Sequence, residues 1–160
     1  MRLIAISVIK DESDIIELFL RINSRVVDKF YILDNGSCDT TLNIINKLIY
    51  EEGLDITIFR EPSLDYQQSD MTLKLLKTAA SYEPFDWAFI LDADEFINIP
   101  RETIEQELSR IPRTAVASLK WSTWIPNGDD YKQHYNPLWS CFRRLKTNFV
   151  ILRKSLFRTS

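Results

Sequence analysis

The segment Phe85-Asp86-Trp87-Ala88-Phe89-Ile90-Leu91-Asp92-Ala93-Asp94-Glu95-Phe96 contains the strongest structural signal of the chain. Its residues 87–91 form an uninterrupted apolar run, which predicts a central strand of a parallel sheet, buried on both faces. Three carboxylates, Asp92, Asp94 and Glu95, follow this run directly. Open α/β sheets bind their ligands at the carboxyl ends of such strands. The segment therefore predicts an α/β fold with an acidic site at one edge of the sheet.

Asp92 and Asp94 are separated by one residue, so on an extended chain their side chains would point the same way. Like charges held close together are unfavourable unless a cation or hydrogen-bond donors neutralise them. Hard divalent cations, which prefer oxygen ligands, meet that need. The alternative is that the carboxylates decorate a helix start. Residues 96–100 (FINIP) lack the pattern of a helix start, so we prefer the metal site.

The composition of the chain is that of one domain with a hydrophobic core, since 45% of its 160 residues are hydrophobic. It has neither a glycine-rich phosphate loop nor a Cys–His cluster, which argues against P-loop nucleotide binding and a zinc site. No apolar run approaches the roughly 20 residues that span a bilayer, and the N-terminal run is too short for a signal peptide. Because Cys38 and Cys141 lie far apart, we expect a reduced, cytoplasmic protein.

Charge is distributed unevenly along the chain. The net charge is -3, yet no acidic residue follows Asp130. The basic residues after that point are Lys132, Arg143, Arg144, Lys146, Arg153, Lys154 and Arg158. A basic segment on an acidic body fits an anionic ligand, an acidic partner or peripheral attachment to the inner face of a membrane. Packing of this segment back onto the acidic body explains the pattern equally well.

Strands and helices are expected to alternate along the first 125 residues. The expected strands are Leu3–Ile9, Lys29–Leu33, Asp55–Phe59, residues 87–91 and Thr114–Trp121, with further strands near Cys141, at Phe149–Leu152 and at 154–158. The expected helices are residues 14–23, capped by Asp11 or Ser13, then 41–51, which Gly53 ends, 69–81 and 100–111. This alternation predicts a mostly parallel sheet with right-handed crossovers.

Polar clusters follow three of the expected strands: Lys10–Glu12, Asp34–Asp39 and Asp92–Glu95. Because parallel strands end at the same edge, we expect the three clusters to converge there. Asp34 and Asn35 are candidates for hydrogen bonds to a base or ribose. Ser37 and Asp39 are better explained as turn and capping residues before the next helix.

The remaining polar and aromatic candidates are less specific. His134 is the single histidine and is a candidate third metal ligand, although a lone histidine is more often structural or solvated. Trp121, Trp124 and Trp139 are expected to be partly core, with one or two available to stack on a sugar.

Three motifs together resemble a known family. KDESD (Lys10–Asp14), YILDNGSCDTT (Tyr31–Thr41) and WAFILDADEF (Trp87–Phe96) resemble the nucleotide-sugar half of family 2 glycosyltransferases, in the branch that carries DADEF. The resemblance covers residues 1–125. It implies a GT-A fold, a Rossmann-like α/β sandwich that binds a nucleoside-diphosphate sugar, most often a UDP-sugar, with Mn²⁺ or Mg²⁺.

The resemblance also implies roles for individual residues. Asp94 would ligate the metal, and Asp92 would contact the ribose or the metal. The residues implied to surround the base and ribose are Val8, Glu12, Asp34 and Asn35. Many relatives have a second acidic residue where Asn35 stands, which leaves the choice of nucleotide open. Lys74, with Lys77 as second choice, is the candidate contact to the phosphates.

The reaction implied is sugar transfer, with inversion, to a glycan or lipid-linked acceptor, as in the synthesis of cell-surface polysaccharide. Inverting relatives use a later Asp or Glu as general base. Here the candidates are Glu95 and Asp130, together with Asp129. Residues 126–160 would begin the acceptor side, so we expect a truncated or naturally short homologue, in which exposed strand edges could drive homodimer formation.

Three alternatives remain open at the level of sequence. The first is a nucleotide-sugar-binding remnant without transfer activity. The second is a nucleotidyltransferase, although residues 9–12 (IKDE) lack the glycine- and basic-rich loop that holds a triphosphate. The third is an α/β interaction module with decorated loops. A nucleic-acid partner is not expected.

Overall fold

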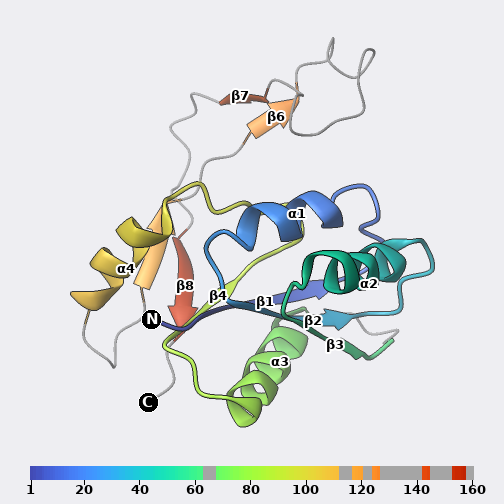
Figure 1. The fold of residues 1–160 in the computed structure, drawn as a ribbon, viewed down its shortest axis with the longest axis horizontal. Helices are drawn as coiled ribbons and strands as arrows, with labels where there is room; N and C mark the ends of the chain where they lie inside the picture. The colour runs from blue at the N-terminus through green and yellow to red at the C-terminus, as the bar shows by residue number, and fades with distance from the viewer. Residues whose placement is uncertain (63–67, 112–116, 121–123, 127–141, 145–152, 158–160) are drawn as a thin grey trace. The chain divides into compact units, whose positions relative to one another are not determined.

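The computed structural model describes residues 1–62, 68–111, 117–120, 124–126, 142–144 and 153–157 (Figure 1). The helices and strands are β1 (Leu3–Ile9), α1 (Ile16–Asn23), β2 (Lys29–Asp34), α2 (Thr41–Glu52), β3 (Ile56–Arg60), α3 (Gln68–Tyr82), β4 (Trp87–Ile90), α4 (Arg101–Ser109), β5 (Ala117–Lys120), β6 (Trp124–Pro126), β7 (Phe142–Arg144) and β8 (Arg153–Phe157).

Strand β1 lies at the centre of the sheet, and all seven of its residues are buried. It pairs in parallel with β2 on one side and with β4 on the other, and β3 pairs in parallel with β2. The strand order is β3-β2-β1-β4-β8-β5, in which β8 runs antiparallel to β4. The predicted α/β class with a mostly parallel sheet is therefore confirmed.

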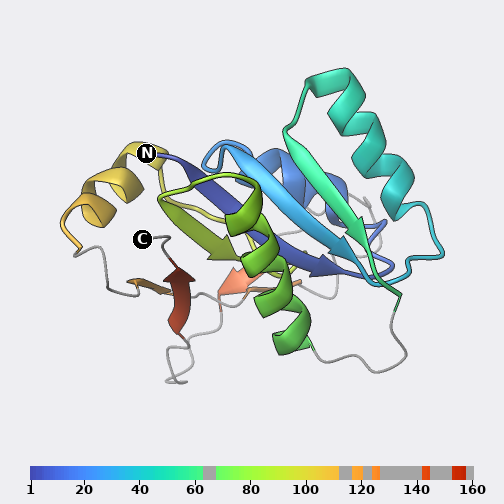
Figure 2. The same ribbon diagram turned by 90° about the horizontal axis from the view of Figure 1, so that it is seen from below.

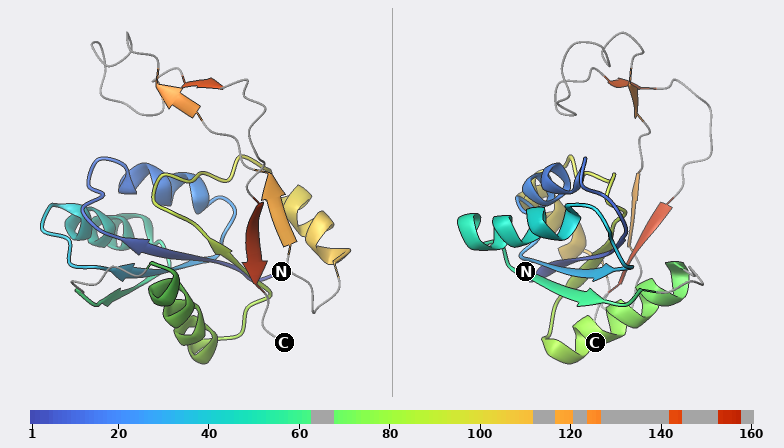
Figure 3. Two further views of the ribbon diagram at one scale, coloured as in Figure 1. Left: turned by 180° about the vertical axis from the view of Figure 1, so that it is seen from behind. Right: turned by 90° about the vertical axis from the view of Figure 1, so that its right-hand side faces the viewer.

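Helices cover both faces of the parallel strands. Helices α1 and α2 lie on one face of the sheet and α3 lies on the other (Figures 1, 2 and 3). The core between α3 and the sheet contains Ile4, Ile6, Val8, Tyr31, Leu33, Met71, Leu75, Ala79, Phe85 and Ala88. Each large apolar side chain that is fully buried contributes about 1.5–3 kcal/mol to folding.

The positions of the predicted elements agree with the structure to within a few residues. Helix α2 ends at Gly53, which adopts a left-handed backbone (φ 66°) as the sequence predicted. The predicted cap of the first helix is wrong: α1 begins at Ile16, and its N-cap residue Ile15 makes no side-chain hydrogen bond. Asp11 instead accepts hydrogen bonds from the loop after β2.

The chain divides into two units, Met1–Ala117 with Ser155–Ser160, and Ser118–Lys154. In the second unit β6 and β7 form an antiparallel pair, and β6 was not predicted. The predicted strand at Phe149–Leu152 lies outside the described residues. In the part of the chain that is described, no helix has the length and apolarity needed to cross a membrane.

Ion pairs hold the amino ends of the strands, at the edge opposite the acidic loops. Arg2 lies 3.0 Å from Glu83, and Lys29 lies 3.1 Å from Glu83 and 3.3 Å from Asp55. The hydroxyl of Tyr31 donates to Glu83 at 2.8 Å. Burial and this hydrogen bond raise the pKa of Tyr31 to about 12. This network ties the start of three strands to the end of α3.

Arg101 joins α4 to the same edge. Its guanidinium donates to both carboxylate oxygens of Asp28, at 2.7 and 3.0 Å, and to the carbonyl of Met1 at 2.8 Å. Asp28 also accepts the backbone N–H of Leu3 at 2.7 Å. Burial alone would raise the pKa of Asp28, but these hydrogen bonds outweigh it and hold the pKa below its usual value.

We predict that Asp28→Asn destabilises the protein by about 1–3 kcal/mol at pH 7, because charge-assisted hydrogen bonds to Arg101 are lost. The folded pKa is lowered, so the contribution of Asp28 is present above the unfolded pKa and is lost as the pH falls through the folded value. Urea denaturation at pH 7 and at pH 3 should therefore show a difference from wild type that shrinks in acid. The exposed control Glu51→Gln should change stability by less than about 0.5 kcal/mol; a deficit independent of pH would contradict the assignment.

Candidate functional site

Loops from three neighbouring parallel strands meet at the carboxyl edge of the sheet. Ile9 at the end of β1 is paired with Asp34 at the end of β2, and Asp34 is paired with Arg60 at the end of β3. Strand β4 lies on the other side of β1 and ends at Ile90. The predicted convergence of the three polar clusters at one edge is thus confirmed by the strand order.

Asp11 joins the loop after β1 to the loop after β2. Its backbone N–H donates to the hydroxyl of Ser37 at 2.9 Å. Its carboxylate accepts the N–H groups of Cys38 at 2.7 Å and of Asp39 at 3.3 Å. Asp11 adopts a positive φ of 55°, which costs a non-glycine residue energy and is best tolerated by Asn and Asp. The hydrogen bonds compensate for this backbone conformation.

A second set of hydrogen bonds continues the connection. The N–H of Glu12 donates to the hydroxyl of Thr41 at 2.8 Å, and the N–H of Ser13 donates to Asp39 at 3.1 Å. Asp39 also accepts the N–H of Thr41, the first residue of α2, at 2.9 Å. Burial opposes ionisation of Asp39, but hydrogen bonds from Thr41 and Ser13 lower its pKa to about 2. Asp39 therefore has the turn and capping role that the sequence favoured.

Asp34 is fully buried, with 0% of its surface exposed. One carboxylate oxygen accepts the N–H of Ser37 at 3.1 Å, and the other accepts Nε of Arg60 at 3.2 Å. The Arg60 side chain is 61% exposed. Asn35 is also buried, and its N–H donates to the carbonyl of Ile9 at 2.8 Å. A ligand approaching from solvent would meet Arg60 before Asp34.

Asp92 to Glu95 form a turn. The N–H of Glu95 donates to the carbonyl of Asp92 at 3.0 Å, and the N–H of Asp92 donates back to the Glu95 carboxylate at 2.9 Å. The expectation of an extended chain through Asp92 and Asp94 is therefore wrong, because β4 ends before them. The alternative that they start a helix is also wrong, since α4 begins at Arg101. Asp94 is exposed and Asp92 is half-buried.

Glu95 is 9% exposed. Its bond to the N–H of Asp92 favours a role in holding the turn over that of a general base. Glu95 is thus placed at the site, in contact with the backbone of the acidic motif.

Electrostatics link the β1 loop to the acidic turn. Partial burial, together with the nearby carboxylates of Asp14 and Asp94, raises the pKa of Glu12. Within the described ranges no group of three or more His, Cys, Asp or Glu side chains is placed to ligate one ion. A cation here would therefore need oxygen ligands from outside this side-chain set.

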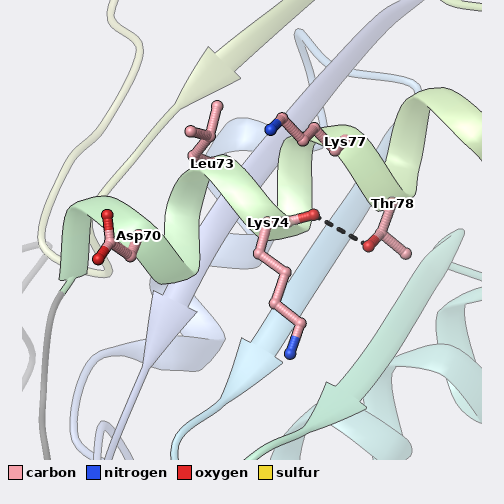
Figure 4. Close-up of a pocket in the computed structure, with 5 residues that line it drawn as sticks. All are labelled: Asp70, Leu73, Lys74, Lys77 and Thr78. Carbon is pink, nitrogen blue, oxygen red and sulfur yellow. Dashed lines mark hydrogen bonds between the residues drawn. The ribbon is translucent and has the colours of Figure 1, made fainter.

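Lys74 on α3 extends toward the end of β3. Its ammonium contacts the Glu61 carboxylate at 2.6 Å, and Glu61 in turn donates its N–H to the carbonyl of Asp34. Figure 4 shows the side chains of Lys74 and Lys77 leaving the helix in different directions. An open depression of about 350 Å³ on α3 is lined by Asp70, Leu73, Lys74, Lys77 and Thr78. This lining comes from one helix and contains none of the loop carboxylates, so we do not place the site there.

The other predicted residues divide into two groups. Val8 is 7% exposed and belongs to the core between α3 and the sheet. Asp130, His134 and the tryptophans Trp121 and Trp139 lie outside the described residues, so their roles stay predictions.

Two residues that contact the loops of the site were missed from the sequence. Arg60 could have been found by aligning the ends of β2 and β3, since a cation directly opposite a buried carboxylate is expected to pair with it. Asn23 carried no signal, because its partners in space are Glu95 and Ile97.

The fold is similar to known structures, although no protein-family model and no curated protein matches the sequence. A crystal structure of S. aureus TarS 1–349 is similar with a TM-score of 0.53 and 18% identity, over 68% of this chain and 32% of that one. Two further structures are less similar. The TarS 1–349 complex with UDP has a TM-score of 0.48 and 17% identity, over 68% of this chain and 31% of that one. Mycobacterium tuberculosis glucosyl-3-phosphoglycerate synthase with UDP has a TM-score of 0.43 and 17% identity, over 71% of this chain and 40% of that one.

The chain spans about a third of the length of the TarS chain it matches. At this level of identity the likeness establishes the fold alone. Together with the strand order, it supports the GT-A fold that the sequence predicted.

We predict that substitutions at Asp11 destabilise the protein in the order Ala, Gly, Asn, from most to least. Ala loses the acceptor and keeps the unfavourable φ, Gly loses only the acceptor, and Asn keeps an acceptor and tolerates the left-handed backbone. We expect Asp11→Ala to cost about 1–2 kcal/mol in urea denaturation. If Asn were as damaging as Ala, the hydrogen bonds to the 38–39 backbone would not be what holds the loops.

Proposed function

We propose that the chain binds a nucleoside-diphosphate sugar, with UDP-sugars first, at the carboxyl edge of its sheet and transfers the sugar to an acceptor. The observation that carries the proposal is the meeting of Glu12, Asp34 and the Asp92–Glu95 turn at that edge of a GT-A fold. Open α/β sheets bind nucleotides in this position. The family resemblance of the three motifs supports the same substrate class.

A divalent cation fits the acidic turn. Asp94 would ligate Mn²⁺ or Mg²⁺, with Asp92 contacting the metal or the ribose. Mg²⁺ is often bound by one or two carboxylates, with water and substrate phosphates completing its coordination. Among the described residues, Asp92 and Asp94 would be the two carboxylates of such an arrangement. When bound, such a cation would neutralise charge on the departing diphosphate.

The base and ribose would lie over the ends of β1, β2 and β3, near Val8, Glu12 and Asn35. Because Asp34 is buried behind Arg60, we propose that Asp34 acts mainly by orienting the guanidinium. Asn35 has an amide where many relatives have a carboxylate, so the edge is less acidic at this position. The preferred nucleotide therefore has to be found by comparing the binding of UDP, GDP and dTDP.

The phosphates would be met by Lys74. In the structure its ammonium is paired with Glu61, so phosphate binding would exchange one anionic partner for another. Lys77 remains the second candidate, although its side chain leaves the helix in a different direction (Figure 4).

Transfer requires a base that removes a proton from the acceptor hydroxyl as it attacks the anomeric carbon. Asp130 remains the proposed candidate, since Glu95 is engaged with the acidic turn. The acceptor is proposed to be a glycan or a lipid-linked sugar. The second candidate function is donor binding without transfer, which the engagement of Glu95 favours.

We predict that UDP stabilises the protein in the presence of Mn²⁺ and that Asp94→Ala abolishes the metal-dependent part of this gain. Ligand at 100 times its Kd raises the free energy of unfolding by about 2.7 kcal/mol. Thermal shift and calorimetry with UDP, GDP and dTDP, each with Mn²⁺ or with EDTA, measure the total stabilisation by the nucleotide and the part of it that depends on the metal. Because Asp94 is exposed, Asp94→Ala should itself change stability by less than about 0.5 kcal/mol.

Glu107→Ala is the matched control, since it removes an exposed carboxylate of α4 far along the sequence from the turn. It should leave UDP binding unchanged. The proposal fails if no nucleotide stabilises wild type with metal present. Slow, metal-dependent hydrolysis of a UDP-sugar without acceptor would favour a transferase over a binding remnant.

A further inference from the structure

We propose that Asn23, at the end of α1, is a positioning residue that holds the Asp92–Glu95 turn in the geometry that binds the metal and diphosphate. This inference rests on the proposed function, because it concerns the same site. It adds a residue that belongs to no loop of the site.

The contacts of Asn23 use both ends of its amide. Nδ2 donates to the carbonyl of Glu95 at 2.8 Å, and Oδ1 accepts the N–H of Ile97 at 2.9 Å. Asn23 is 0% exposed, so water does not compete for these groups. A buried amide with both of its ends bonded to backbone stabilises one position of the segment, since displacing the segment would leave buried polar groups without partners.

The acidic turn needs such support from outside. Residues 91–100 form no helix or strand, so their backbone groups must find partners beyond a regular ladder. Strand β4 ends at Ile90, and the N–H of Leu91 makes the last bond to β1, to Ile6 at 3.0 Å. Asn23 attaches this segment to the end of α1, through the carbonyl of Glu95 and the N–H of Ile97.

A continuous path of hydrogen bonds leads from Asn23 to the proposed metal ligands. Asn23 holds the backbone of Glu95, whose carboxylate accepts the N–H of Asp92, and whose own N–H closes the turn that contains Asp94. The carbonyl of Asn23 also accepts the N–H groups of Val26 and Val27 at 2.9 and 3.0 Å. The end of α1 is therefore itself held, and it serves as a rigid support.

Removing the Asn23 amide is expected to affect diphosphate binding and not nucleoside binding. The β1 and β2 loops, which would hold the base, are connected to each other by Asp11 and Asp39 and not by Asn23. Loss of the Asn23 amide should therefore weaken the metal-dependent binding of a diphosphate and spare the binding of the nucleoside. A residue that only stabilises the fold would affect both equally.

The test compares wild type, Asn23→Ala, the near-isosteric Asn23→Asp and the exposed α2 control Asn46→Ala. Calorimetry or NMR titration measures the binding of UDP with Mn²⁺, of UDP with EDTA, and of uridine. Substitutions that disturb the support of metal ligands commonly weaken metal binding by about 10- to 100-fold. We expect Asn23→Ala to weaken the binding of UDP with Mn²⁺ by about tenfold or more. The affinity for uridine should stay within about twofold of the wild-type value. Asn46→Ala should match wild type throughout.

A measurement on wild type keeps the inference testable if both Asn23 variants fail to fold. The amide of Ile97 should already be protected from hydrogen exchange in the free protein, and UDP with Mn²⁺ should increase its protection by no more than it increases that of the core amides of β1, which report the global stabilisation by the ligand. Fast exchange that becomes slow only with ligand would overturn the inference, as would equal binding by folded Asn23→Ala. Wild type that binds no nucleotide with metal would instead refute the proposed function itself.

Discussion

Parallel pairing of β1 with β2 on one side and β4 on the other is the constraint on which the rest of the structure depends. All seven residues of β1 are buried, so the strand must be paired along both edges and covered on both faces. Parallel neighbours end where β1 ends. Side chains as distant in sequence as Glu12, Asp34 and Asp92 are therefore brought to one edge by core packing and backbone pairing, without any direct attraction between them.

Bringing carboxylates together at one edge is electrostatically unfavourable, and a different partner compensates for it at each position. Asp34 is buried and compensated by Arg60, and the Glu95 carboxylate is bonded to the backbone of its own turn. Glu12 and Asp94 repel each other, which contributes to the raised pKa of Glu12. A bound cation would relieve that repulsion, so the charges that repel one another would strengthen binding of a metal and its diphosphate.

Prediction from sequence succeeded where the signal was local or periodic. The apolar run of β1, the stop at Gly53 and the polar clusters after the strands were correct because each depends on side-chain type within a few residues. It failed at the start of α1, where Asp11 bonds the neighbouring loop instead of capping its own helix. It failed also at Asp92 and Asp94, where a turn replaces the extended chain. At the start of α1 a contact from another part of the fold decided the local conformation, whereas the acidic turn is closed by hydrogen bonds between Asp92 and Glu95 and is attached to α1 by Asn23.

The sequence by itself determined the α/β class, the order of the elements and the identity of the acidic edge, because hydrophobic periodicity and turn chemistry are properties of neighbouring residues. Only the tertiary structure decided how that edge is built: Arg60 against Asp34, the loops joined through Asp11, and Asn23 holding the acidic turn. The physical reason is that hydrogen-bond partners at these positions lie 26 to 74 residues apart in sequence, and their pairing depends on distances that exist only once the sheet has formed.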